Sequence, residues 1–103
     1  MACICFEKYC TLNSVGVHVY MQGTRGVHVD VPETIRQCAD VEEGAVLYLE
    51  HLAFEIFKLA RAYATPVSEK EISAAIVQNM ALITAVYYES HGSVLNTAHK
   101  EGA

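Results

Sequence analysis

The chain has 103 residues, of which 52% are hydrophobic and 18% are charged, and its net charge is −5. This length suits one domain of ordinary size. The apolar content excludes a mainly disordered chain, which would be poor in hydrophobic residues and rich in charge. The negative charge argues against binding through nucleic-acid phosphates, so we expect no nucleic-acid partner.

Residues 3–11 are ambiguous in the sequence. Ile4 and Phe6 fit a strand, and Asn13 with Ser14 would form a turn into the next element. We therefore expect a third strand here, which would complete an antiparallel meander. The alternative is a two-stranded hairpin, which would be marginal without helices that cover it.

Valine recurs at every second position in two segments, near residues 15–22 and 26–31. A period of two is typical of a half-buried strand. The glycine-containing loop between the two segments predicts that they pair as a β-hairpin.

The length and place of the hairpin loop decide which polar residues face each other. A loop at residues 23–25 places all the valines on one face, with His18 opposite Asp30 and Tyr20 opposite His28. A loop that lies one residue earlier pairs His18 with His28 instead. Both registers keep the polar residues on the second face of the hairpin.

The rest of the chain carries the start and stop signals of helices. Asp40 is a predicted N-cap, and Ser68 with Glu71 is a predicted capping box. Gly92 is the expected C-terminal stop of the last helix, followed by a frayed tail over residues 93–103. The predicted helices lie near residues 33–38, 41–64 and 69–91.

These elements predict an α+β fold with one domain over residues 1–103. An N-terminal antiparallel β-hairpin or three-stranded meander would pack on a C-terminal antiparallel helical hairpin. We further expect a homodimer, for reasons that come from the helix faces.

The first long helix carries apolar residues on its polar side. Leu47 and Phe54 lie seven residues apart among charged residues, with His51 and Lys58 close by. A solvated helix face does not require this pair. An apolar ridge with a charged rim is typical of a contact site.

The last helix is apolar or small all round, which is typical of a helix that is covered on both sides. Asn79 falls within its core stripe, where an amide needs a backbone or water partner. A second subunit related by two-fold symmetry would cover the small-residue side, whereas a monomer would leave it exposed. The predicted interface residues on this helix are Ala74, Val77, Ala81 and Tyr88.

The polar face of the hairpin is the candidate for a chemical site. His18 opposite Asp30 would pair a general base with its orienting group, and His28 lies on the same face. We find no nucleophile motif and no phosphate-binding loop in the sequence. A half-buried sheet also has such a polar face without any function.

Neither a metal nor a cofactor is expected. Cys3, Cys5, Cys10 and Cys38 lack the paired spacing of a structural zinc site, so we expect buried, inert thiols. His51 and Glu55 lie one helical turn apart, but they lack a metal-binding motif.

The opening of the chain does not resemble a signal peptide, so we expect a cytoplasmic protein. The longest uncharged run is a little short for a membrane span and contains polar residues, so we expect no membrane partner.

Three hypotheses follow for function. The first is a small non-enzymatic binding or interaction module that acts as a homodimer and binds itself, and a protein or small molecule besides. The second is a small enzyme or ligand-binding protein that uses His18, Asp30 and His28. The third is an antitoxin-like regulator, which the lack of a basic helix disfavours.

Overall fold

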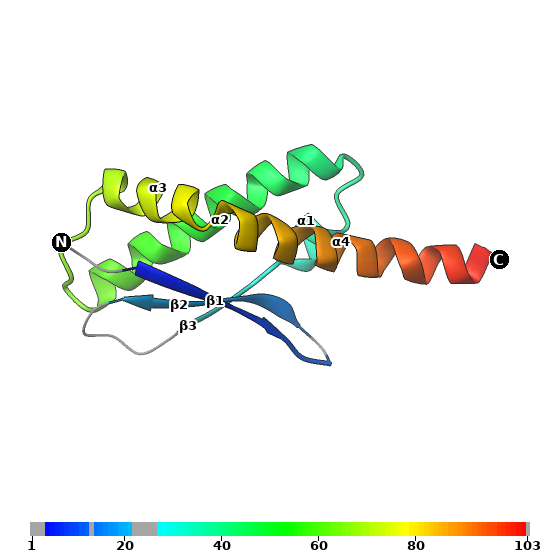
Figure 1. The fold of residues 1–103 in the computed structure, drawn as a ribbon, viewed down its shortest axis with the longest axis horizontal. Helices are drawn as coiled ribbons and strands as arrows, with labels where there is room; N and C mark the ends of the chain where they lie inside the picture. The colour runs from blue at the N-terminus through cyan, green and yellow to red at the C-terminus, as the bar shows by residue number, and fades with distance from the viewer. Residues whose placement is uncertain (1–3, 13, 22–26, 103) are drawn as a thin grey trace.

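The computed structural model describes the backbone of residues 4–12, 14–21 and 27–102, and their side chains as far as His91. In these ranges a sheet precedes a group of helices, which all lie on one face of the sheet (Figure 1). The elements are β1 (Ile4–Cys10), β2 (Val15–Met21), β3 (Val27–Asp30), α1 (Glu33–Arg36), α2 (Val41–Ala62), α3 (Glu69–Gln78) and α4 (Met80–Gly102). The α+β class and the three-stranded antiparallel meander are confirmed.

The strands pair in the order β1-β2-β3, and both pairings are antiparallel. His18 faces His28, and Asp30 faces Gly16. The predicted register that placed His18 opposite Asp30 and Tyr20 opposite His28 is therefore wrong, and the alternative register is confirmed. The valines share one face in both registers, so the hydrophobic pattern cannot distinguish them. The hairpin loop itself lies outside the described residues.

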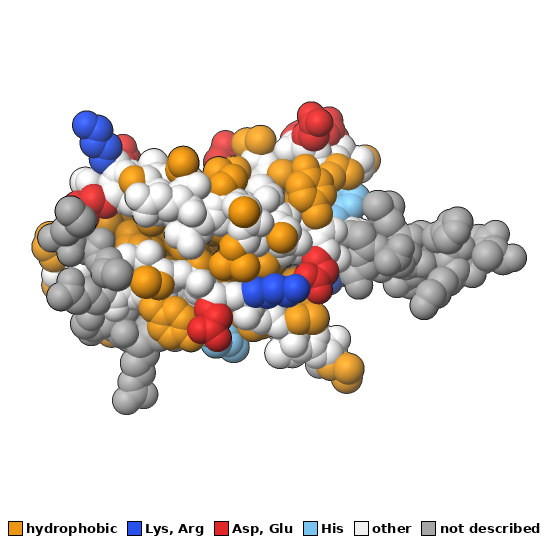
Figure 2. Space-filling model, viewed as in Figure 1, with side chains coloured by type: hydrophobic (Ala, Val, Ile, Leu, Met, Phe, Trp, Pro, Cys, Tyr) orange, Lys and Arg blue, Asp and Glu red, His pale blue; other side chains and the backbone are white. Residues whose placement is uncertain are grey.

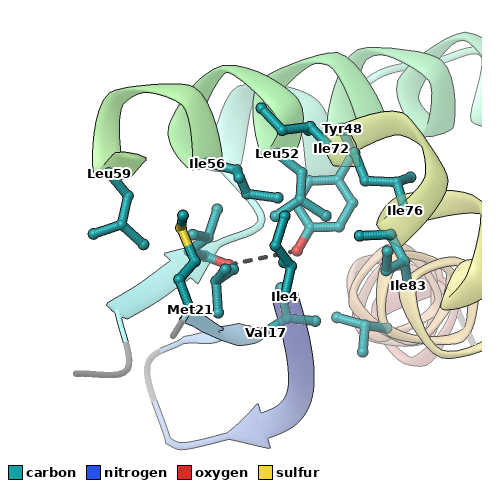
Figure 3. Packing of buried hydrophobic residues seen from close by; sticks show 14 of the residues in the cluster. Ile4, Val17, Met21, Tyr48, Leu52, Ile56, Leu59, Ile72, Ile76 and Ile83 are labelled. Carbon is teal, nitrogen blue, oxygen red and sulfur yellow. Dashed lines mark hydrogen bonds between the residues drawn. The ribbon is translucent and has the colours of Figure 1, made fainter. Parts of the chain in front are cut away.

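The core lies between the sheet and the helices. Val17 and Val19 of β2 are fully buried against this layer. Ile72 and Ile76 of α3 reach into the same space, and Figure 3 shows them beside Tyr48 of α2. Burial of such side chains contributes about 1.5–3 kcal/mol each, which makes this layer the main source of stability.

Tyr48 connects the two layers by a polar contact. Its side chain has no exposed surface, and its hydroxyl donates a hydrogen bond to the Val29 carbonyl at 3.4 Å (Figure 3). Burial raises the pKa of this phenol, and the charge of Asp30 raises it further. Tyr63, at the end of the same helix, is by contrast about half exposed.

The two longest predicted helices each start at a side-chain N-cap, as expected. The Asp40 carboxylate accepts the Glu43 amide at 3.1 Å, and the Ser68 hydroxyl accepts the Glu71 amide at 3.1 Å. The Glu71 carboxylate also accepts the Ser68 amide, which completes the capping box.

The last predicted helix, residues 69–91, is wrong in two respects. It is interrupted at Asn79, whose side-chain amide donates to the Ala75 carbonyl at 2.8 Å and ends α3. The amide thus has the backbone partner that its place in the core stripe required. Gly92 is also no stop, because α4 continues past it to Gly102, and the predicted tail over residues 93–103 is helical as far as residue 102. This end of α4 extends beyond the sheet (Figure 1).

Two polar contacts join α4 to the first residue of α2 and to the segment before it. The Tyr87 hydroxyl donates to the Val41 carbonyl at 2.9 Å. The ring nitrogen Nε2 of His91 lies 3.0 Å from the Cys38 carbonyl. Both side chains are buried, so these contacts give their polar groups a hydrogen-bond partner.

Candidate functional site

Large apolar side chains are exposed along the outer side of α2. The exposed fraction is 59% for Phe54, 41% for Phe57 and 39% for Leu47. All three point away from the core that Tyr48 and Leu52 occupy on the same helix. The predicted ridge of Leu47 and Phe54 is thus exposed, and Phe57 extends it.

A hollow of about 460 Å³ lies between α2 and α3. Phe54 and Phe57 form part of its wall, and Glu69 stands at the start of α3. The complete lining is Ala53, Phe54, Phe57, Glu69, Ile72 and Ser73. This mostly apolar wall with one carboxylate and one hydroxyl suits a hydrophobic side chain of a partner better than a polar substrate.

Two cations lie over the exposed rings. Lys58 Nζ is 5.3 Å from the centre of the Phe54 ring, and the Arg61 guanidinium is 5.9 Å from that of Phe57. Lys58 also donates to the Glu55 carboxylate at 3.3 Å. These contacts orient the charged groups around the apolar ridge. The charged groups then resemble the polar rim that surrounds the centre of a protein interface. His51, also predicted for this surface, is half-buried.

The predicted interface residues of the last helix are exposed too. Val77 is 65% exposed, and Tyr88 packs edge-on against the ring of Tyr87. None of these residues lines the hollow. The break at Asn79 divides them into Ala74 and Val77 on α3, and Ala81 and Tyr88 on α4. Figure 2 shows hydrophobic side chains over this side of the molecule, with few charged groups among them.

The outer face of the sheet carries a cluster of four rings. His18 and His28 stack at 4.0 Å between ring centres, only 10° from parallel. Tyr9 stacks on His28 at 4.3 Å, and the Tyr20 hydroxyl lies 3.2 Å from Nδ1 of His18. The predicted pair of a general base with a carboxylate is replaced by a pair of imidazoles. Sequence reasoning missed Tyr9 because β1 itself was uncertain.

Tyr9 reaches across β2 because Gly16 has no side chain. The two residues are directly opposite, and a Cβ atom at Gly16 would lie 2.9 Å from the Tyr9 hydroxyl and 2.8 Å from the Asp30 Cα. An aromatic residue that covers a glycine on the neighbouring strand protects the exposed backbone. The ring cluster is therefore explained by the packing of the sheet.

The described residues hold no group of three or more metal-ligand side chains within reach of one ion. Cys5 and Cys10 are exposed, and Cys38 is half-buried, so the prediction of buried thiols is wrong for the first two. Both lie on β1, an edge strand of the described sheet. Cys3 lies outside the described residues.

Among the described helices, none combines the length and the hydrophobicity that crossing a membrane requires. Comparison with protein-family models, with curated proteins and with solved structures gave no match.

Proposed function

We propose that the protein is a small non-enzymatic binding module that acts as a homodimer, with the outer side of α2 as its contact surface. The observation that carries this proposal is the exposure of Leu47, Phe54 and Phe57 on one side of a single helix, next to an apolar hollow. Aromatic anchors beside a pocket, with charges around them, are the usual composition of an interface centre and its rim.

The catalytic alternative has less support. It required His18 to be oriented by Asp30, and the Nδ1 atom of His18 lies against the Tyr20 hydroxyl instead. The hollow described above lies on the helical layer, whereas the ring cluster lies on the outer face of the sheet.

Substitution of the ridge tests the proposal. We expect Phe54→Glu and Leu47→Glu each to weaken self-association by tenfold or more, since truncation of an interface anchor costs about 2 kcal/mol. Native mass spectrometry and sedimentation velocity over a range of concentrations would measure this.

Leu12→Glu is the matched control, because Leu12 is fully exposed in the turn after β1 and lies off the helical layer. A wild-type protein that stays monomeric at the highest concentration would contradict the dimer. Association that survives both ridge substitutions would remove Leu47 and Phe54 from the contact surface.

A further inference from the structure

Six exposed residues of α2 recur at alternating intervals of four and three residues. We name them the α2 seam: Glu43, Leu47, Glu50, Phe54, Phe57 and Arg61. An alternation of four and three averages 3.5 residues, the repeat by which one helix packs along another in a coiled coil. The seam extends over about 27 Å at 1.5 Å per residue. It is a second stripe, separate from the stripe of Tyr48, Leu52, Ile56 and Leu59 that faces the core.

The charges of the seam are sorted along the helix. Glu43 and Glu50 lie in its first half, and Arg61 lies at its end. Lys58 adds a second positive charge to the later half, where it lies over the Phe54 ring and also pairs with Glu55, so this half keeps a net positive charge. Favourable interaction with the helix dipole explains an acidic first turn and a basic last turn, but it does not reach Glu50 in the middle of the helix.

We propose that the α2 seam binds the α2 seam of a second copy, with the two helices antiparallel. This inference rests on the proposed function and adds its geometry. A two-fold axis near residue 52 pairs Glu43 with Arg61 of the other copy and Leu47 with Phe57. Glu50 then lies opposite Phe54, whose neighbouring Lys58 offers it a positive charge.

Charge complementarity selects this occupant. In the antiparallel arrangement the acidic half of each seam meets the basic half of the other, and a two-fold axis repeats each contact twice. In a parallel arrangement the glutamates would face glutamates, which opposes association. Phe54 and Phe57 also line the hollow, so each copy presents rings and a recess side by side.

Charge exchange within the seam gives a direct test. A swapped variant carries Glu43→Lys, Glu50→Lys, Lys58→Glu and Arg61→Glu, and its net charge equals that of the wild type. We expect it to dimerise, because its halves are again complementary. A half-swapped variant, with Glu43→Lys and Glu50→Lys only, should associate about tenfold more weakly or worse.

The decisive measurement mixes the swapped variant with the wild type. Like charges would meet in an antiparallel mixed dimer, so native mass spectrometry should find mixed dimers well below the statistical proportion. Glu7→Lys is the control, because it reverses a charge on the outer face of the sheet. Circular dichroism would verify that each variant is folded.

A second measurement uses the wild-type protein, in case the swapped variant does not fold. Zero-length carbodiimide crosslinking of an equal mixture of ¹⁴N and ¹⁵N protein should join Glu43 or Glu50 of one copy to Lys58 of the other. The isotope pattern separates this product from an internal link between Glu55 and Lys58.

The outcomes separate the two proposals. The antiparallel seam would be overturned if mixed dimers form at or above the statistical proportion, or if no crosslink joins two copies. The proposed contact surface would survive either result as long as Phe54→Glu still weakens the dimer. A monomeric wild type would overturn both proposals.

Discussion

Gly44 is a glycine because a residue that is distant in sequence packs closely against it. It is buried in α2, and a Cβ atom there would collide with the Tyr87 hydroxyl and lie 3.2 Å from the Cys38 Cβ. Helix propensity alone favours alanine over glycine by about 1 kcal/mol. The glycine is therefore explained by the close approach of α4 and not by the helix that contains it.

This contact predicts that Gly44→Ala destabilises the protein by up to about 2 kcal/mol. Overpacking typically costs about 1–3 kcal/mol, and the gain in helix propensity offsets part of it. Urea denaturation followed by circular dichroism would measure the change. Tyr87→Phe removes the atom that collides, so the double variant should lose less than the sum of the single ones. A stabilised Gly44→Ala variant would contradict the proposed contact.

At the scale of elements, the end of α2 is strained. Ala64 has a φ of 53°, in the left-handed region that favours glycine. The turn is held by the Thr65 amide, which donates to the Ala60 carbonyl at 2.9 Å, as in a Schellman motif. The chain thus reverses toward α3 without the glycine that usually occupies this position.

We expect Ala64→Gly to stabilise the protein by about 0.5–1 kcal/mol, because glycine adopts a positive φ without the steric cost. Ala62→Gly is the matched control, since Ala62 is the last residue of α2 and glycine lowers helix stability there. Thermal melts of both variants would show shifts of opposite sign. A lower midpoint for Ala64→Gly would rule out strain at this turn.

At the scale of the whole molecule, Tyr48 joins the helical layer to the sheet. Its raised pKa means that the folded protein keeps this phenol neutral at a pH where the unfolded chain ionises it. Stability from this group is complete below the ordinary tyrosine pKa of about 10. It decreases as the pH rises above that value, since the unfolded state then releases a proton that the folded state retains.

The free energy of unfolding should therefore fall as the pH rises above about 10, the ordinary tyrosine pKa. Tyr48→Phe should be less stable at neutral pH by about 1 kcal/mol, through loss of the hydrogen bond to Val29. The free energy of unfolding of Tyr48→Phe should also decrease less steeply as the pH rises. Urea titrations at several pH values would test this, and equal slopes would contradict a buried, neutral phenol.

The sequence alone determined the class of fold and most element boundaries. Alternation of valines predicts strands wherever one face is buried, and the capping residues Asp40, Ser68 and Glu71 act on backbone amides of their own helix turn. The exposed ridge of Leu47 and Phe54 also followed from helical periodicity. These signals are local, so a single sequence contains them in full.

The tertiary structure decided what depends on distant partners. The stack of His18 on His28 required the strand register, and the path of Tyr9 required Gly16 beneath it. The break at Asn79 separated α3 from α4, although apolar periodicity continues through it. In each case several local conformations satisfied the same hydrophobic pattern. The choice among them came from packing between elements, which a pattern along the chain does not record.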